Sequence, residues 1–86
     1  MTDHWYAYIV CCADNTLYTG VTTDIQRRIV EHNHDNKLGA RYTRSRRPVH
    51  LVYSEEVSSR AEACAREHAI KKLSRVNKEK LITQTT

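Results

Sequence analysis

The segment WYAYIVCCADNTLYTGV, residues 5–21, carries the strongest structural signal in the chain. Aromatic and apolar side chains dominate residues 5–12, and a shorter segment of the same kind covers residues 17–21. Ala13-Asp14-Asn15 lies between them and supplies turn residues, because Asp and Asn adopt turn conformations readily. Two apolar segments joined by such a turn predict a β-hairpin.

The length of the turn determines which side chains share a face of this hairpin, because a slip of one residue moves every side chain to the other face. A three-residue loop, with Asn15 in the left-handed conformation, places Tyr8 opposite Gly20 and both Tyr8 and Tyr18 on one face. A two-residue loop instead places Tyr18 opposite Cys11 and separates the two hydroxyls. The three-residue loop is the one that a joint role of the two tyrosines requires.

The remainder of the chain predicts helices and one further strand. Asp24 is a good N-cap, and Ile25 and Ile29 follow with the spacing of one helical face. The expected elements are a helix over 24–34, a loop with a basic segment, a strand over 49–55, a helix over 59–73 and a last helix from Ser74. The order ββαβαα predicts an α+β fold, a three-stranded antiparallel sheet flanked by three helices. We expect one domain over 4–82 and a frayed tail over 83–86.

Composition narrows the class of protein. A chain of 86 residues suits one small domain. It has no apolar run near the roughly 20 residues that span a bilayer, and its first residues lack the features of a signal peptide, so we expect a cytoplasmic protein. Three cysteines form no paired framework and five histidines form no zinc pattern, which disfavours disulfides and structural zinc.

The formal charge is +4, and the positive side chains are concentrated in residues 37–47. This basic segment holds no acid and contains Lys37, Arg41, Arg44, Arg46 and Arg47, interleaved with Tyr42, Thr43 and Ser45. Cations, hydroxyl donors and a stacking ring suit the backbone of a nucleic acid. The composition equally fits a solvated surface loop.

Two tyrosine motifs followed by an arginine resemble the GIY-YIG nuclease domain. Tyr8 in Tyr-Ala-Tyr corresponds to the tyrosine of GIY, Tyr18 and Gly20 in Tyr-Thr-Gly correspond to YIG, and Arg28 corresponds to the arginine of the first helix. Neither string is complete, because Tyr6 replaces glycine and Thr19 replaces isoleucine. The resemblance extends over about residues 5–82 and is greatest to small stand-alone GIY-YIG proteins related to the nuclease domain of the excision-repair endonuclease.

The resemblance implies a metal-dependent hydrolysis of phosphodiester bonds in which several side chains share the work. Tyr8 or Tyr18 would take the proton of the attacking water, as a phenolate or through a relay. A tyrosine pKa near 10 is too high for a base at neutral pH, so Arg28 is expected to lower it as well as to stabilise the phosphorane. Glu67 would hold one divalent ion, Mg²⁺ or Mn²⁺, with its carboxylate on the same face of the sheet as the two tyrosine hydroxyls. His32 and Asn77 stand at further positions that match family residues, Asn77 with an unsettled register.

Each of these residues also has an ordinary structural interpretation. A strand tyrosine usually serves packing, and a helix histidine such as His32 is often half-buried. Glu67 has Lys71 one turn later, where the two form an exposed ion pair.

Two functions therefore compete. The first is a single-metal nuclease that acts on DNA rather than RNA, in repair or recombination, with the basic segment and Lys71 contacting the nucleic acid. The second is a nucleic-acid-binding module of the same fold that does not cleave. A monomer is expected, with room for a protein partner that supplies affinity for DNA.

Overall fold

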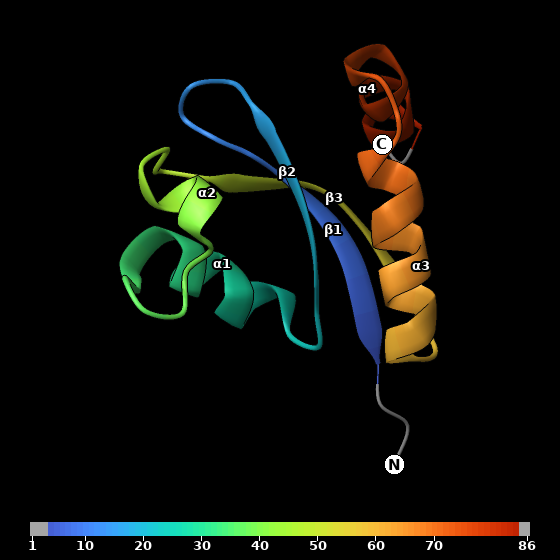
Figure 1. Cartoon of the computed structure of the whole chain (residues 1–86), viewed down its shortest axis with the longest axis horizontal. Helices are drawn as coiled ribbons and strands as arrows, with labels where there is room; N and C mark the ends of the chain where they lie inside the picture. Colours follow the sequence, from blue (N-terminus) through green and yellow to red (C-terminus); the bar gives the residue numbers. More distant parts are fainter. Residues whose placement is uncertain (1–3, 85–86) are drawn as a thin grey trace.

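The structure, a computed structural model, describes residues 4–84 and contains the predicted succession of strands and helices with one added short helix (Figure 1). The elements are β1 (Trp5–Cys11), β2 (Leu17–Thr22), α1 (Ile25–His34), α2 (Arg41–Arg44), β3 (His50–Val57), α3 (Arg60–Lys71) and α4 (Arg75–Thr83). The three strands form one antiparallel sheet in the order β2-β1-β3. This is the predicted α+β class.

The hairpin has the predicted three-residue loop. Asn15 adopts a left-handed conformation with φ of 67°, and the backbone N–H of Cys12 donates to the carbonyl of Thr16 over 2.8 Å. Tyr8 consequently pairs with Gly20 across the strands, and Tyr18 pairs with Val10. Tyr8 and Tyr18 therefore lie on one face of the sheet.

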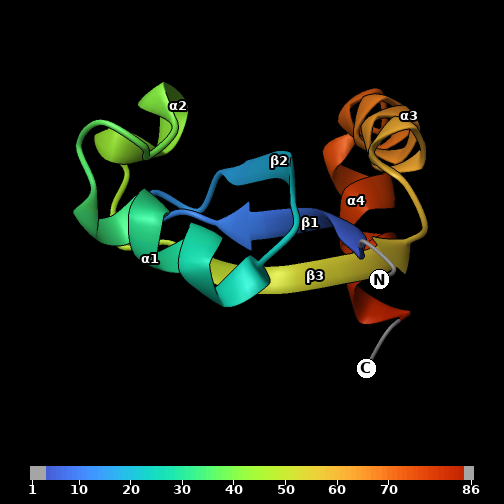
Figure 2. The ribbon, with the colours of Figure 1, turned by 90° about the horizontal axis from the view of Figure 1, so that it is seen from below.

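The central strand β1 places its alternate side chains in two hydrophobic clusters, one on each face of the sheet. One cluster contains Ala7, Ile9, Tyr53 and Ile70, with Leu17, Val52, Leu81 and Ile82 packed against it. The other contains Tyr8, Val10, Cys12 and Val49, with Tyr18, Ile25 and Ile29 packed against it. Helix α1 thus covers the tyrosine face, and α3 and α4 cover the opposite face (Figures 1 and 2).

Three of the helices begin at residues whose side chains accept a hydrogen bond from the backbone of the first turn. Asp24 accepts from the N–H of Arg27 at α1, and Ser74 accepts from the N–H of Asn77 at α4. Ser59 accepts from the N–H of Glu62 at α3. The Glu62 carboxylate accepts hydrogen bonds from the N–H and hydroxyl of Ser58, one residue before the cap, in a variant of the capping box.

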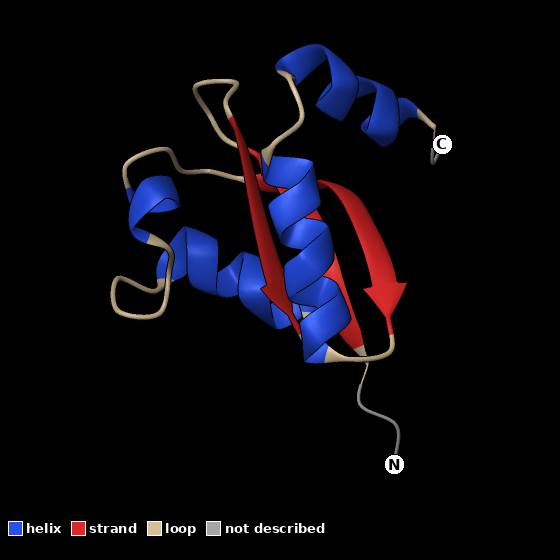
Figure 3. Cartoon of the chain, turned by 45° about the vertical axis from the view of Figure 1, so that its right-hand side comes forward, coloured by secondary structure: helices blue, strands red, loops and turns tan. Residues whose placement is uncertain are grey.

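The structure differs from the expectation at two places. Helix α2 forms within the basic segment that we expected to be loop (Figure 3). The helix α4 includes Thr83 and is capped by Gln84, so the predicted fraying does not begin at Thr83, and residues 85–86 of that predicted tail lie outside the described residues. Fraying was predicted from the position of these residues at the end of the sequence, but backbone hydrogen bonds such as that from the Gln84 N–H to the Lys80 carbonyl continue to the end of the helix.

Thr19, which replaces the isoleucine of YIG, is buried on the face that α3 covers. It pairs with Ile9 across the hairpin, and only 3% of it is exposed. Its hydroxyl has no hydrogen-bond partner among the described residues. The side chain therefore fills the place of an apolar residue by shape. Within residues 4–84 no helix has the length and apolar character needed to cross a membrane.

Candidate active site

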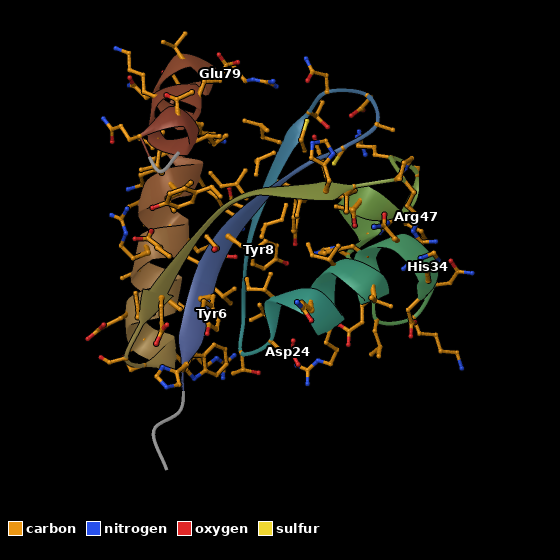
Figure 4. The ribbon with its side chains drawn as sticks, turned by 180° about the vertical axis from the view of Figure 1, so that it is seen from behind. Tyr6, Tyr8, Asp24, His34, Arg47 and Glu79 are labelled. Atoms are coloured by element: carbon orange, nitrogen blue, oxygen red, sulfur yellow. The ribbon has the colours of Figure 1, made fainter. Side chains whose placement is uncertain are left out.

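Tyr8 extends from β1 toward α1 and ends against His32 (Figure 4). The Tyr8 hydroxyl lies 2.7 Å from Nε2 of His32. Tyr8 is 1% exposed and His32 is fully buried, so this polar contact is closed to bulk water. His32 is therefore not the half-buried surface residue of the ordinary interpretation but part of a polar pair in the core.

Arg28 favours one direction of the Tyr8–His32 hydrogen bond. Its positive charge acts on the Tyr8 side chain. A guanidinium has donors and no acceptor, so it favours a Tyr8 hydroxyl whose oxygen faces it and whose hydrogen points away, toward His32. Tyr8 thus donates to Nε2 of His32.

Burial keeps both members of this pair neutral. The loss of solvent raises the pKa of Tyr8 to about 12, and Arg28 lowers it by less than burial raises it. Arg28 therefore acts in the expected direction but does not bring the Tyr8 pKa into the range of a base at neutral pH. Burial, together with the charge of Arg28, lowers the pKa of His32 to about 4, so the imidazole is neutral at pH 7.

Arg28 is oriented by contacts at the outer end of the site. Its Nη1 donates to the Glu31 carboxylate over 2.9 Å and to the Leu38 carbonyl. The neighbouring Arg27 points to solvent, with 59% of its side chain exposed. The contact with Glu31 was missed from the sequence, although the spacing i, i+3 on one helix is a recognisable signal for such a pair.

Tyr18 lies between the buried pair and the surface. Its ring meets the His32 ring edge-on at 5.4 Å and stacks on Tyr42 at 5.7 Å between ring centroids. The Arg46 guanidinium lies 4.0 Å from the centroid of the Tyr42 ring and pairs with Asp14 of the hairpin turn at 3.1 Å. Tyr18 is half-buried, which makes it the more accessible of the two motif tyrosines.

Gly20 is required by space rather than by backbone conformation. No described glycine has a positive φ. A Cβ atom at Gly20 would lie 2.6 Å from the Tyr8 hydroxyl oxygen and 2.8 Å from Cζ of the same ring. The glycine therefore leaves the space that the Tyr8 ring occupies over β2.

Glu67 reaches the site from the other side of the sheet. We expected its carboxylate on the tyrosine face, but α3 packs against the opposite face because Ala63 and Ile70 face that cluster. The Tyr8 hydroxyl lies over Gly20 of the edge strand β2, against which α3 packs, and the charge of Glu67 contributes to the raised pKa of Tyr8. The carboxylate thus lies within electrostatic range of the buried pair.

The Glu67 carboxylate, as a single oxygen ligand group, suits one hydrated divalent ion. Its side chain is 25% exposed, and Lys71 lies 3.4 Å away in the predicted ion pair. Across residues 4–84, no three His, Cys, Asp or Glu side chains come together as a metal cage. Mg²⁺ keeps several waters and commonly binds one or two carboxylates with substrate oxygens, so a single carboxylate fits it.

The basic segment divides into outward and inward side chains. Lys37, Arg41 and Arg44 are exposed. Arg47 instead donates to the carbonyls of His32 and Asp35 at the C-terminal end of α1 (Figure 4), and this leaves its guanidinium engaged within the protein. Thr43 is fully buried and cannot contact a nucleic acid at the surface, contrary to the sequence-based expectation.

Two remaining sequence-predicted residues have limited roles in this geometry. Lys71 is exposed at the end of α3, beside Glu67. Asn77 is exposed in the first turn of α4, where its backbone N–H completes the cap at Ser74. The structure brings Tyr8, His32, Arg28 and Tyr18 together, with Glu67 in electrostatic range of Tyr8, and the catalytic roles of these five residues stay predictions.

Replacing Gly20 by alanine tests the close contact with Tyr8. The added Cβ overlaps a buried ring that is held by a hydrogen bond, so we expect a loss of about 1–3 kcal/mol in the free energy of unfolding, measured by urea denaturation. In a Tyr8→Phe background the closest contact atom is gone, and the penalty should be smaller. Equal penalties in the two backgrounds would contradict this explanation of the motif glycine.

The low pKa of His32 predicts a pH-dependent stability. The folded pKa is about 4 and the ordinary value is 6.5, so between pH 6.5 and 4 the unfolded chain binds a proton that the folded chain refuses. The free energy of unfolding should therefore fall by about 3 kcal/mol as pH decreases through this window. His32→Gln should remove that part of the slope, whereas His68→Gln, at an exposed position on α3, should leave it unchanged. Identical pH profiles for wild type and His32→Gln would contradict the assignment.

Comparison with known proteins identifies a domain family and several relatives that match this chain. The model of the GIY-YIG catalytic domain matches residues 4–80. The UPF0213 protein DP2720 of Desulfotalea psychrophila is 63% identical over 78 residues, which are 91% of this chain and 70% of that protein. The UPF0213 protein NP_0776A of Natronomonas pharaonis is 52% identical over 84 residues, 98% of this chain and 95% of that protein.

Solved structures agree in fold. The solution NMR structure of the UPF0213 protein BH0048 from Bacillus halodurans is 43% identical, with a TM-score of 0.60 over 94% of this chain and 84% of that one. The solution NMR structure of the protein EF2693 from E. faecalis is 38% identical, with a TM-score of 0.63 over 99% of this chain and 91% of that one. The chain therefore belongs to the GIY-YIG catalytic domain family, and its relatives include small UPF0213 proteins.

Proposed function

We propose that this protein is a metal-dependent nuclease that hydrolyses phosphodiester bonds in DNA. The observation that carries the proposal is the buried, neutral pair of Tyr8 and His32, on which the positive charge of Arg28 acts. A tyrosine that serves only to fill the core does not require a buried imidazole beside its hydroxyl. A tyrosine that transfers its proton in a site without bulk water requires a nearby base to accept that proton.

In the proposed reaction Tyr8 acts through a relay. The attacking water transfers a proton to the Tyr8 oxygen while the Tyr8 hydrogen moves to Nε2 of His32, which leaves a neutral phenol and an imidazolium. A prior ionisation of Tyr8 is unfavourable, because with a pKa of about 12 only about one molecule in 10⁵ is a phenolate at pH 7. Burial of the pair excludes bulk solvent, so the relay serves a water that enters with the substrate.

The substrate itself strengthens the base. Arg28 contributes to the low pKa of His32 through its positive charge. A phosphate bound by Arg28 offsets that charge, and the negative charge that develops on the phosphorane favours the imidazolium. The basicity of His32 therefore rises at the moment when the proton is transferred.

Glu67 and the exposed cations complete the proposed site. Glu67 would hold a divalent ion, which supplies Lewis-acid stabilisation of the leaving oxygen when bound. Arg41 and Arg44 point outward from α2 beside Tyr42 and would contact the DNA backbone. Lys71, which pairs with the Glu67 carboxylate over 3.4 Å, would contact phosphate if a metal ion took its place at that carboxylate.

Cleavage of labelled duplex, branched and single-stranded DNA, with and without Mg²⁺ or Mn²⁺, tests the proposal. We expect metal-dependent cleavage by the wild type. Tyr8→Phe should lower the single-turnover rate at least about 10²-fold, because it deletes the relay hydroxyl and keeps the ring. Glu67→Gln should abolish cleavage and preserve DNA binding, measured by fluorescence anisotropy.

The chain provides a matched control for the arginine. Arg28→Ala should abolish cleavage, whereas Arg27→Ala changes the neighbouring exposed arginine that shares the Glu31 partner and should leave the rate within about threefold. A full rate for Tyr8→Phe would refute the relay. If the wild type binds the DNA panel and cleaves none of it with either metal, the non-catalytic binding module replaces the nuclease.

A further inference from the structure

We propose that Thr43 is a positioning residue that holds His32 in the tautomer with hydrogen on Nδ1 and none on Nε2. This inference rests on the proposed function for its catalytic consequence, but the tautomer itself follows from the hydrogen bonds. The Thr43 hydroxyl oxygen lies 2.8 Å from Nδ1 of His32. Both residues are fully buried.

Tyr8, His32, Thr43 and the Ala40 carbonyl form a series of hydrogen bonds, and the Thr43 end of this series determines that Nδ1 of His32 carries a hydrogen. A hydroxyl has one hydrogen, and that of Thr43 is donated to the Ala40 carbonyl over 3.0 Å. The Thr43 oxygen can therefore only accept from His32. Nδ1 carries the hydrogen, and in a neutral imidazole Nε2 then has a lone pair.

The Tyr8 end is consistent with the same tautomer. The described residues give the Tyr8 hydroxyl no acceptor other than His32. The positive charge of Arg28 favours a Tyr8 hydroxyl whose hydrogen points away from the guanidinium. The opposite tautomer would direct an Nε2 hydrogen at a hydroxyl whose own hydrogen then has no partner, which is unfavourable in a buried site. One assignment satisfies all three side chains.

Helix α2 combines this inward contact with an outward surface. Thr43 faces the core, and Arg41, Tyr42 and Arg44 on the same four-residue helix are exposed. Two residues that follow α2 hold this segment against its neighbours. Arg47 donates to the Asp35 carbonyl at the end of α1, and Arg46 donates to Asp14 in the hairpin turn. The segment that offers cations to nucleic acid thus also orients the histidine that accepts the proton.

Nitrogen-15 NMR of the ¹⁵N-histidine-labelled chain at pH 7 reads the tautomer directly, because protonated and unprotonated ring nitrogens have distinct shifts. For wild type we expect His32 with Nδ1 protonated. Thr43→Val keeps the approximate shape but offers Nδ1 no acceptor, so its His32 signals should shift toward the Nε2-protonated form. Thr43→Ser keeps the hydroxyl and should restore the wild-type pattern.

The kinetic expectation separates positioning from substrate contact. Thr43→Val should lower kcat about 10–100-fold, as outer partners of catalytic groups commonly do, and leave KM within about twofold because Thr43 does not reach the substrate. Thr43→Ser should recover most of the rate.

Three results would overturn the inference: wild-type His32 protonated on Nε2, an unchanged tautomer in Thr43→Val, or failure of Thr43→Ser to keep the wild-type pattern. The NMR measurement needs no cleavage, so it stands if the nuclease proposal fails. If Thr43→Val does not fold, the wild-type and Thr43→Ser spectra still decide the tautomer.

Discussion

The hydrogen bond between Tyr8 and His32 is the interaction on which the rest of the site depends. It joins the central strand β1 to helix α1 across 24 positions of the chain, in a place without access to bulk water. Gly20 leaves room for the Tyr8 ring, and Thr43 completes the partners of His32. The motif glycine, the motif tyrosine and the short helix α2 therefore serve one buried contact, although they lie in separate segments of the sequence.

Burial gives this contact a chemical character that exposed groups would not have. It raises the pKa of the phenol and lowers the pKa of the imidazole, so that both are uncharged at neutral pH. A neutral donor and acceptor can pass a proton without prior formation of a buried charge, whose desolvation is costly. Arg28 on one side and Glu67 on the other then supply the charges that act on substrate and metal in the proposed reaction.

The sequence predicted the local structure well because short-range chemistry determines it. Turn residues ending in Asn15 fixed the hairpin register, and Asp24, Ser59 and Ser74 marked the helix starts. Long-range contacts escaped prediction, since composition does not reveal which cation faces inward. Arg47 and Thr43 were thus assigned to a DNA surface, whereas the structure engages both within the protein and exposes Arg41 and Arg44. The Glu67 carboxylate was expected on the tyrosine face, whereas its helix α3 packs against the other face. The balance between burial and the charge of Arg28 at Tyr8 required the packed structure.

The pKa of Tyr8 tests the central claim most directly, because a relay requires a protonated phenol and a phenolate base requires an ionised one. Tyrosine labelled with ¹³C at Cζ gives one NMR signal for each of the five tyrosines, and Tyr8→Phe identifies the signal of Tyr8. The account predicts that Tyr8 stays protonated well above the ordinary tyrosine pKa near 10 and titrates only at about pH 12. Ionisation of Tyr8 at or below pH 10 would contradict it.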